Sequence, residues 1–242
     1  MHIAIISDIH GNLEALVSVL NEIEKLRVDE IHCLGDVVGY GCNPVECLNL
    51  IEENARVKLM GNHEYAILGH ITTESYTAIA KISSAWTREI LSDREFSIIA
   101  DFKLRHSFDD ILMVHASPFE DDHWRYILTP EEAYRAFEVI SEKICFYGHS
   151  HLPMIFSESL SGLPRKQVGH NFDPFEESRY LVNVGSVGQP RDNDPRACFV
   201  TFDTETREIE FHRVEYDINK AQSKMTKAKL PEMLINRLAV GR

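Results

Sequence analysis

The beginning of the chain combines residue types that bind metal ions. Asp8 and His10 lie in the sequence SDIHGN at positions 7–12, directly after a short apolar run at residues 3–6. A carboxylate and an imidazole two residues apart on extended backbone point the same way, so both can ligate one ion. These residues predict a metal site at the end of the first strand.

The same arrangement recurs four times. Short apolar runs end in GD at residues 35–36, in GNHE at 61–64, in His115 and in GHSH at 148–151. Ligands of an open α/β sheet bind outside the carboxyl ends of its strands, so five such endings would bring their polar groups to one place. His115 alone would more often be a hydrogen-bonded core or rim residue. Together, however, these acidic and imidazole groups would carry unpaired charge in one crevice without a cation, which favours a metal centre.

The composition excludes several functional classes. The chain has 242 residues, 44% of them hydrophobic, and a formal net charge of -13. This suits one large α/β domain and argues against a non-specific binder of nucleic acids or of an anionic membrane. The five cysteines have no CxxC spacing, which is typical of reduced, buried thiols. Because the first residues lead directly into a strand, without a signal sequence, we expect a cytoplasmic protein.

The elements that would position these groups alternate between strands and helices. Apolar spacing predicts helices over residues 12–26 and 44–53, each between two strands, which is the βαβ pattern of a parallel sheet. A capping box at residues 129–132 opens a further helix. Later extended pieces predict a second, mostly antiparallel sheet packed on the first; they cover residues 153–157, 180–184, 197–203 and 208–216.

Two helical segments complete a single domain expected to span residues 1–242. A helical insertion at about residues 65–100 either packs against the sheet or caps a substrate pocket. A tail at about residues 217–242 has helical spacing that is broken at Pro231. The basic residues of the tail are more typical of a solvated helix face than of a binding patch.

The five polar blocks resemble the calcineurin-like metallophosphoesterase family, and most closely its bacterial and archaeal branch with the sequences SDIHGN, GDVVGYG, GNHE and GHSH. The resemblance covers about the first 190 residues. It implies an α/β fold, namely a four-layer α/β/β/α sandwich of two packed, mostly mixed β-sheets flanked by helices.

The resemblance also implies two transition-metal ions, divalent or trivalent, for which Mn, Fe and Zn all suit the nitrogen and oxygen ligands. Asp36 would bridge both ions, which would share a hydroxide that attacks the phosphoester. His63 would be catalytic and donate a hydrogen bond or a proton to the leaving oxygen. The other implied ligands are Asp8, His10 and His151 for one ion, and Asn62, His115 and His149 for the other.

The substrate side departs from other branches of the family. Tyr40 stands where protein serine/threonine phosphatases carry a phosphate-clamping arginine, and Gly39 stands where they carry an acidic residue. The partner that orients His63 is therefore open, with Glu64 as an available substitute. Arg191, in the sequence GQPRDNDPR at 188–196, is either a replacement clamp or part of a structural ion pair.

An aromatic segment follows His115 and offers a second candidate contact with substrate. Trp124, together with His123 and Tyr126, could stack on a base, although an aromatic loop is more often part of the core or the rim. The sequence thus predicts a hydrolase for a phosphodiester, a phosphomonoester or a dinucleoside polyphosphate, with a small phosphoester or nucleotide as its partner. The alternative is a non-catalytic interaction scaffold, but scaffolds of this fold typically lose the ligands that this chain retains.

Overall fold

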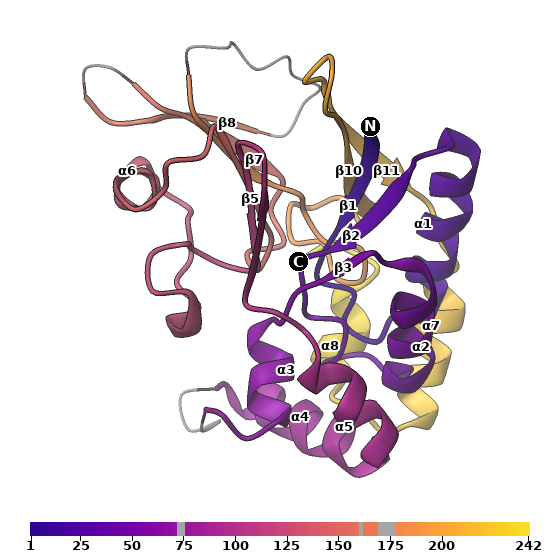
Figure 1. Cartoon of the computed structure of the whole chain (residues 1–242). Helices are drawn as coiled ribbons and strands as arrows, with labels where there is room; N and C mark the ends of the chain where they lie inside the picture. The colour runs from indigo at the N-terminus through magenta and orange to yellow at the C-terminus, as the bar shows by residue number, and fades with distance from the viewer. Residues whose placement is uncertain (72–75, 160–161, 169–177) are drawn as a thin grey trace.

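The first β-sheet is built around the N-terminal strand. The computed structural model describes residues 1–71, 76–159, 162–168 and 178–242. The sheet has the order β11-β10-β1-β2-β3 (Figure 1). In it β1, β2 and β3 are parallel, and β10 is antiparallel to both of its neighbours, β1 and β11. Its strands are β1 (His2–Ile6), β2 (Glu30–Cys33), β3 (Val57–Lys58), β10 (Ala197–Asp203) and β11 (Ile209–Val214).

The second sheet lies against the first and has the order β4-β5-β6-β9-β7-β8. β5, β6 and β9 are parallel, and the outer strands are antiparallel to their neighbours. Its strands are β4 (Arg105–Phe108), β5 (Ile111–Val114), β6 (Ile144–Tyr147), β7 (Met154–Ser157), β8 (Arg165–Val168) and β9 (Tyr180–Asn183).

Burial on both faces explains why the first strand is apolar throughout. Ala4 and Ile6 pack with the helices outside the first sheet, whereas Ile3 and Ile5 pack against the second sheet. A strand covered on both faces has no polar side to alternate with, so its sequence is a continuous apolar run.

The expected division of the strands between the sheets is wrong in one respect. β10 and β11 join the first sheet beside β1 instead of forming the second sheet, and β5 and β6 of the first half belong to the second sheet. Apolar patterning shows that a segment is a buried strand, but it does not show which strand it pairs with. The predicted sandwich of two mixed sheets flanked by helices is confirmed.

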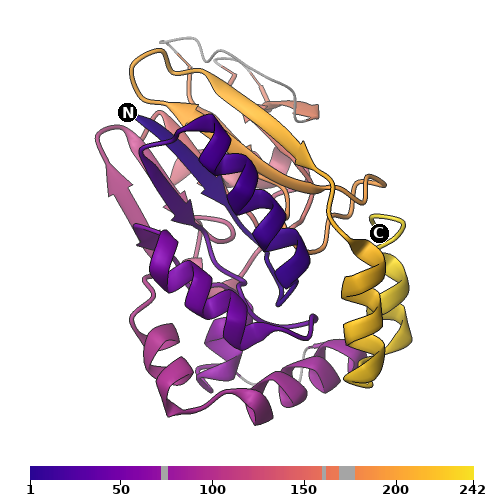
Figure 2. The same cartoon turned by 90° about the vertical axis from the view of Figure 1, so that its right-hand side faces the viewer.

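Helices cover the outer faces of both sheets (Figure 1), and Figure 2 looks onto the helices that cover the first sheet. The helices α1 (Leu13–Leu26) and α2 (Pro44–Asn54) pack on the first sheet, and α6 (Pro130–Glu138) packs on the second. The side chain of Asn12 caps α1, and the predicted capping box opens α6. None of the helices in the described ranges combines the length and apolarity that crossing a membrane requires.

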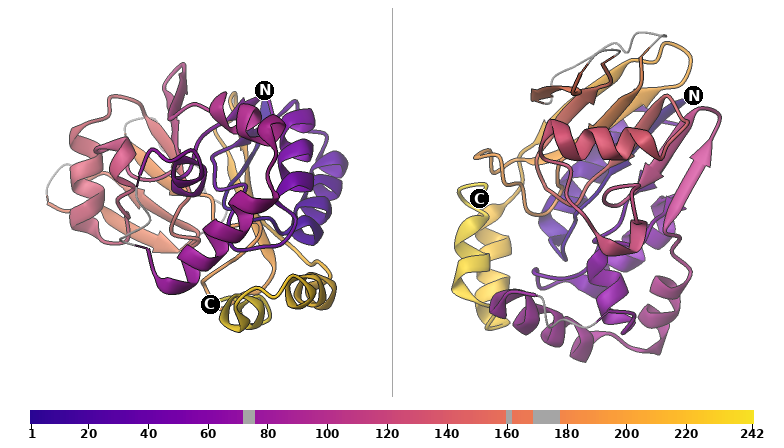
Figure 3. Two further views of the ribbon diagram at one scale, coloured as in Figure 1. Left: turned by 90° about the horizontal axis from the view of Figure 1, so that it is seen from below. Right: turned by 90° about the vertical axis from the view of Figure 1, so that its left-hand side faces the viewer.

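The insertion and the tail meet at one end of the molecule (Figure 3). The insertion begins at Asn62, and residues 72–75 within it lie outside the described residues; its helices are α3 (Asn62–Ile67), α4 (Ala78–Ile90) and α5 (Asp93–Ala100). The tail forms α7 (Ile218–Lys227) and α8 (Glu232–Arg237), with the predicted break at Pro231. Ile67 and Ile99 pack with the first sheet, whereas Trp86 of α4 packs with the tail, so the insertion both covers the sheet and supports the tail.

Candidate metal centre

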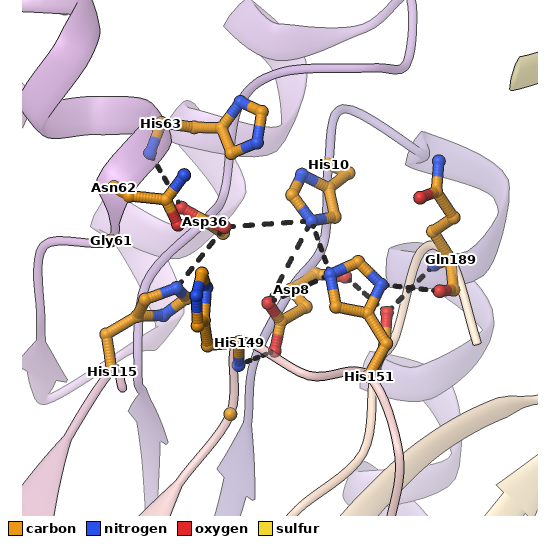
Figure 4. Close-up of polar contacts among 12 residues, drawn as sticks. Asp8, His10, Asp36, Gly61, Asn62, His63, His115, His149, His151 and Gln189 are labelled. Atoms are coloured by element: carbon orange, nitrogen blue, oxygen red, sulfur yellow. Dashed lines mark hydrogen bonds and ion pairs between the residues drawn. The ribbon is translucent and has the colours of Figure 1, made fainter. Parts of the chain in front are cut away.

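The five polar blocks converge at one end of the sandwich, but they come from two sheets instead of one. Loops after β1, β2 and β3 approach from the first sheet, and loops after β5 and β6 approach from the second (Figure 4). The ends of both sheets therefore enclose a single buried cluster. Its side chains form three overlapping groups: Asp8, His10 and His151; His10, Asp36 and His63; Asp36, His115 and His149.

The backbone around these side chains is not extended, contrary to the expectation for Asp8 and His10. β1 ends at Ile6, and Asp8 and His10 have φ angles of 55° and 50°. Left-handed backbone is unfavourable for residues other than glycine and occurs often at functional sites. Three further predicted ligands share this conformation: Asp36 (50°), His149 (64°) and His151 (60°).

One half of the cluster surrounds Asp8. The Nε2 atom of His151 lies 3.3 Å from Asp8 Oδ1 and 3.1 Å from Nε2 of His10. The other carboxylate oxygen, Asp8 Oδ2, accepts a hydrogen bond from the backbone N–H of His149 at 2.9 Å. One oxygen of Asp8 is thus used to order the loop, and the other faces the imidazoles.

The second half of the cluster surrounds Asp36, which also contacts the first half. Asp36 Oδ2 lies 3.2 Å from His115 Nε2 and 3.8 Å from His10 Nε2. Asp36 Oδ1 accepts a hydrogen bond from the backbone N–H of His63 at 2.9 Å. A single oxygen of Asp36 therefore lies between the two halves.

Backbone carbonyl groups orient three of the imidazoles. The Nδ1 atoms of His10, His115 and His151 lie 3.1 Å, 3.0 Å and 2.6 Å from the carbonyl oxygens of Val38, Leu34 and Gln189. Because a carbonyl oxygen only accepts, each Nδ1 donates its hydrogen and leaves the Nε2 lone pair directed at the cluster. Outer hydrogen bonds of this kind fix the tautomer of metal-binding histidines.

The unpartnered atoms of the cluster suit a cation. Asp8 Oδ1, Asn62 Oδ1 and His115 Nε2 are buried and make no hydrogen bond with any described residue. Buried polar atoms normally have partners, and all three of these atoms can donate a lone pair. Their types are the oxygen and nitrogen donors that divalent transition metals accept, so the cluster fits two such ions.

The charges of the cluster also shift the pKa values of its members. Burial lowers the pKa of His149 to about 3, because a charged imidazole loses its hydration there. For His115 burial acts in the same direction, but the adjacent Asp36 and Asp8 outweigh it and raise the pKa to about 9. A metal ion that binds His115 Nε2 near neutral pH must therefore displace a proton.

His63 has no acidic partner in the described residues. Its ring lies 4.5 Å from the ring of Tyr40, 5.0 Å from that of His10 and 5.8 Å from that of Tyr76, and its Nδ1 atom makes no hydrogen bond with the part of the chain that the structure describes. Gly39 provides the space for this ring, because a Cβ atom there would lie 2.2 Å from His63 Nδ1. Aromatic packing thus holds the His63 side chain, with no carboxylate of a described residue to orient it.

Glu64 is not the substitute partner of His63. Its buried carboxylate accepts hydrogen bonds from the backbone N–H groups of Asp36, Val38 and Gly61 at 2.8 Å, 3.0 Å and 2.9 Å. Burial and the nearby charge of Asp36 raise its pKa to about 7. Glu64 therefore joins the loops after β2 and β3, and does not orient the histidine beside it.

The three predicted substrate contacts lie around the cluster. The Tyr40 ring lies 4.6 Å from the His10 ring, and the guanidinium carbon of Arg191 lies 5.9 Å from the Tyr40 ring. The Trp124 ring lies 5.9 Å from the His115 ring, on the opposite half. Tyr126 is about half exposed and stacks on the His149 ring at 4.3 Å, whereas the exposed His123 pairs with Asp122.

Sequence reasoning missed the residues that hold the Asp8 loop in place. The Ser186 hydroxyl donates to the carbonyl oxygen of Asp8 at 2.8 Å, and Asn183 Nδ2 donates to the carbonyl oxygen of Gly148 at 2.6 Å. The backbone carbonyl of Gln189 orients His151, as described above. The available signal was the run of small and polar residues directly after the buried strand β9.

Comparisons with known proteins show the family. The sequence model described as "Calcineurin-like phosphoesterase superfamily domain" matches residues 1–207. An uncharacterized protein of Methanocaldococcus jannaschii, MJ0912, is 38% identical over 99% of this chain and 98% of its own length.

Solved structures show the same fold. The crystal structure of a metallophosphoesterase from Sphaerobacter thermophilus has a TM-score of 0.89 and 38% identity, with full coverage of both chains. The hypothetical protein PH1004 from Pyrococcus horikoshii OT3 has a TM-score of 0.79 and 20% identity, covering 100% of this chain and 98% of its own.

Proposed function

Since this chain belongs to the calcineurin-like phosphoesterase superfamily, we propose that it is a metal-dependent hydrolase of a small phosphoester or nucleotide. Its substrate is a phosphodiester, a phosphomonoester or a dinucleoside polyphosphate. The observation that carries this proposal is the set of buried atoms on Asp8, Asn62 and His115 that make no hydrogen bond with any described residue and face one cluster. A protein that used this end of the sandwich only as a scaffold would have no need to bury such atoms.

Two ions are assigned to the two halves of the cluster. Asp36, whose Oδ2 atom lies between His10 and His115, would hold both ions. Such a pair of ions supplies positive charge for the phosphoryl oxygens and lowers the pKa of a water molecule. Mn, Fe and Zn all suit the donor set. The remaining ligands are Asp8, His10 and His151 for one ion, and Asn62, His115 and His149 for the other.

The protein's own groups supply the rest of the reaction. His63 is held between Tyr40 and Tyr76 with a free Nδ1 atom, and it hydrogen-bonds the substrate or protonates the leaving oxygen. The backbone N–H of His63 also holds Asp36 Oδ1, so the catalytic side chain and the shared ligand are fixed relative to each other. Orientation of this kind lowers the barrier because fewer degrees of freedom are lost during the reaction.

A direct test measures bound metal and hydrolysis together. The purified chain is assayed with Mn²⁺ on a chromogenic phosphodiester and on a chromogenic phosphomonoester, and its metal content is determined by mass spectrometry. We expect close to two ions per chain and hydrolysis that stops on chelation. Bound metal without turnover of these esters or of a dinucleoside polyphosphate would support the scaffold alternative instead.

A further inference from the structure

Two arginines that are distant in sequence meet beside the metal centre. Arg191 Nη2 and Arg237 Nη1 both donate to the side-chain oxygen of Gln189, at 2.9 Å and 3.0 Å. Arg191 follows β9, whereas Arg237 ends α8 in the tail, beyond the residues that the superfamily model matches. We call Arg191 and Arg237 the arginine pair.

The position of the arginine pair is fixed relative to the metal centre through Gln189. The carbonyl oxygen of Gln189 accepts from Nδ1 of His151 at 2.6 Å, and the backbone N–H of Arg191 donates to the carbonyl oxygen of His151 at 3.2 Å. Figure 4 shows the side-chain amide of Gln189 beyond His10 and His151, on the side away from Asp36. The arginine pair therefore borders the half of the centre that contains Asp8.

The tail holds Arg237 firmly in this place. Leu234 and Leu238 of the tail belong to a buried cluster that includes Tyr40. The backbone N–H of Asn193 donates to the carbonyl oxygen of Gly241 at 2.8 Å, and Arg237 Nε donates to the carbonyl oxygen of Arg242 at 2.5 Å. The tail is thus docked on the loop that carries Arg191, so the two guanidinium groups have a defined spacing.

Arg191 has no carboxylate partner within the described part of the chain, whereas Arg237 contacts the main-chain oxygen of the last residue, Arg242, through Nε and leaves its other nitrogens without an acidic partner there. No described Asp or Glu carboxylate lies within 4.0 Å of either guanidinium group, although other arginines of the same region are paired, such as Arg196 with Asp194 and Arg213 with Asp192. Arg191 Nε is buried and makes no hydrogen bond with any described residue. Burial and the charge of Arg191 lower the pKa of Arg237. An anion at this position would reduce the repulsion between the two guanidinium groups and accept hydrogen bonds from their N–H groups.

We propose that the arginine pair is a subsite for a phosphate group of the substrate other than the one that is hydrolysed, so that the physiological substrate carries at least two phosphate groups. Guanidinium groups bind phosphate through paired hydrogen bonds. Metal ions held by the centre would supply the positive charge for the hydrolysed phosphate, so two further cations at the edge of the centre suit a neighbouring phosphate. This inference rests on the proposed function and narrows its substrate class to nucleoside polyphosphates and similar compounds.

The subsite is tested first by binding, without any turnover. Inorganic pyrophosphate is titrated calorimetrically into the full-length, metal-free chain, whose folding is verified by its melting temperature. Arg237→Gln should weaken binding about tenfold, the effect of losing one charge-assisted contact. Arg237→Lys, which keeps the charge, should recover part of the loss. Arg196→Gln removes the same charge from the same loop, where Asp194 pairs it, and should bind like the unchanged chain.

The outcomes of this titration separate the subsite from the rest of the proposal. Equal binding by the unchanged chain and Arg237→Gln, or no pyrophosphate binding by the unchanged chain, would overturn the arginine subsite even if the enzyme hydrolyses phosphoesters. Binding that depends on Arg237 would support the subsite even if the assay under the proposed function found no turnover.

A kinetic comparison shows which phosphate the arginine pair contacts. With Mn²⁺ present, the KM of ADP and the KM of a chromogenic diester with a single phosphate are measured for Arg237→Gln and the unchanged chain. The KM increase should be at least about fivefold larger for ADP, because only ADP reaches both sites. Equal increases for both substrates would place the arginine pair on the hydrolysed phosphate and overturn the inference.

Discussion

The candidate metal centre and the arginine pair are adjacent, but their chemistry is opposite. The centre presents lone pairs, since Asp8 Oδ1 and His115 Nε2 are buried without hydrogen bonds to described residues. The arginine pair presents N–H donors that share one neutral acceptor, the side chain of Gln189. Gln189 contacts both regions through its carbonyl oxygen and its side chain. One loop can thus order a cation site and an anion site next to each other.

The metal centre and the arginine pair are also positioned by different elements of the fold. The centre is built from loops after five strands, within the residues that the superfamily model matches. The arginine pair depends on packing of the tail, residues 218–242, against the Tyr40 loop and α4. Substitution of a metal ligand should therefore change metal binding without removing the arginine pair, and the first of the four predictions below tests that separation.

Asp36→Asn should have the largest effect. The substitution removes the charge of the shared ligand, and asparagine tolerates the φ of 50° at this position, so the fold should persist. Loss of an outer partner of a metal ligand already costs up to about 100-fold in metal affinity, so loss of the ligand itself should cost more. Metal analysis should show depleted protein without turnover. Pyrophosphate binding by the metal-free chain should be retained; its loss would show that the two regions are not separate.

His63→Ala should abolish most of the turnover while the metal content stays normal. Loss of a general acid typically lowers kcat about 100- to 10,000-fold. The control is His70→Ala, which removes an exposed imidazole just after α3 and should leave kcat unchanged. Metal depletion in His63→Ala equal to that in Asp36→Asn would refute the division between ligand and catalytic residue.

Gly39→Ala should lower kcat about 10- to 100-fold, because its Cβ would lie 2.2 Å from His63 Nδ1 and displace the ring. Gly69→Ala is a matched control, since the φ angles are similar, 84° and 83°, but a Cβ at Gly69 meets nothing within 4 Å. Both substitutions should cost a similar backbone strain of about 1–2 kcal/mol in the free energy of unfolding. Only Gly39→Ala should change turnover, and equal kcat values in the two variants would contradict this reasoning.

Ser186→Ala should have the smallest effect and should act on the connection between the two regions. Its hydroxyl donates to the carbonyl oxygen of Asp8 at 2.8 Å and accepts from the backbone N–H of Gln189 at 2.9 Å. Loss of these contacts should lower the free energy of unfolding by about 1–3 kcal/mol and weaken metal affinity about tenfold. Ser84→Ala, which removes a buried hydroxyl that has no hydrogen-bond partner among the described residues, should change metal affinity little. Equal metal affinities in these two variants would show that Ser186 does not position Asp8.

The sequence was sufficient to predict the cluster because each member follows a short apolar run. Strand ends such as Ile6 and Val114 can be recognised locally, and the polar residues after them share one chemistry. The helices were predictable for the same reason: Asn12 caps α1, and Thr129 caps α6. Local patterns of this kind do not require knowledge of the pairing between strands.

The features that could not be predicted depend on contacts between distant residues. β10 pairs with β1 because the two sheets must share one core, and no local pattern carries that information. The basic residues of the tail were expected to be solvated, yet Lys224 pairs with Glu14 at 2.6 Å and Arg237 reaches Gln189 across 48 positions. Long side chains such as those of lysine and arginine reach partners in distant elements, so helical periodicity does not predict their contacts.

Left-handed backbone at the predicted ligands lowers the stability of the fold at the positions that its proposed activity requires. Each such residue other than glycine sacrifices about 1 kcal/mol that glycine would recover. A library of variants selected only for folding at high temperature should therefore accumulate glycine at these positions. The selected variants should have higher melting temperatures and no activity. A library selected for phosphoester turnover should keep the original residues; the positions concerned are Asp8, His10, Asp36, His149 and His151.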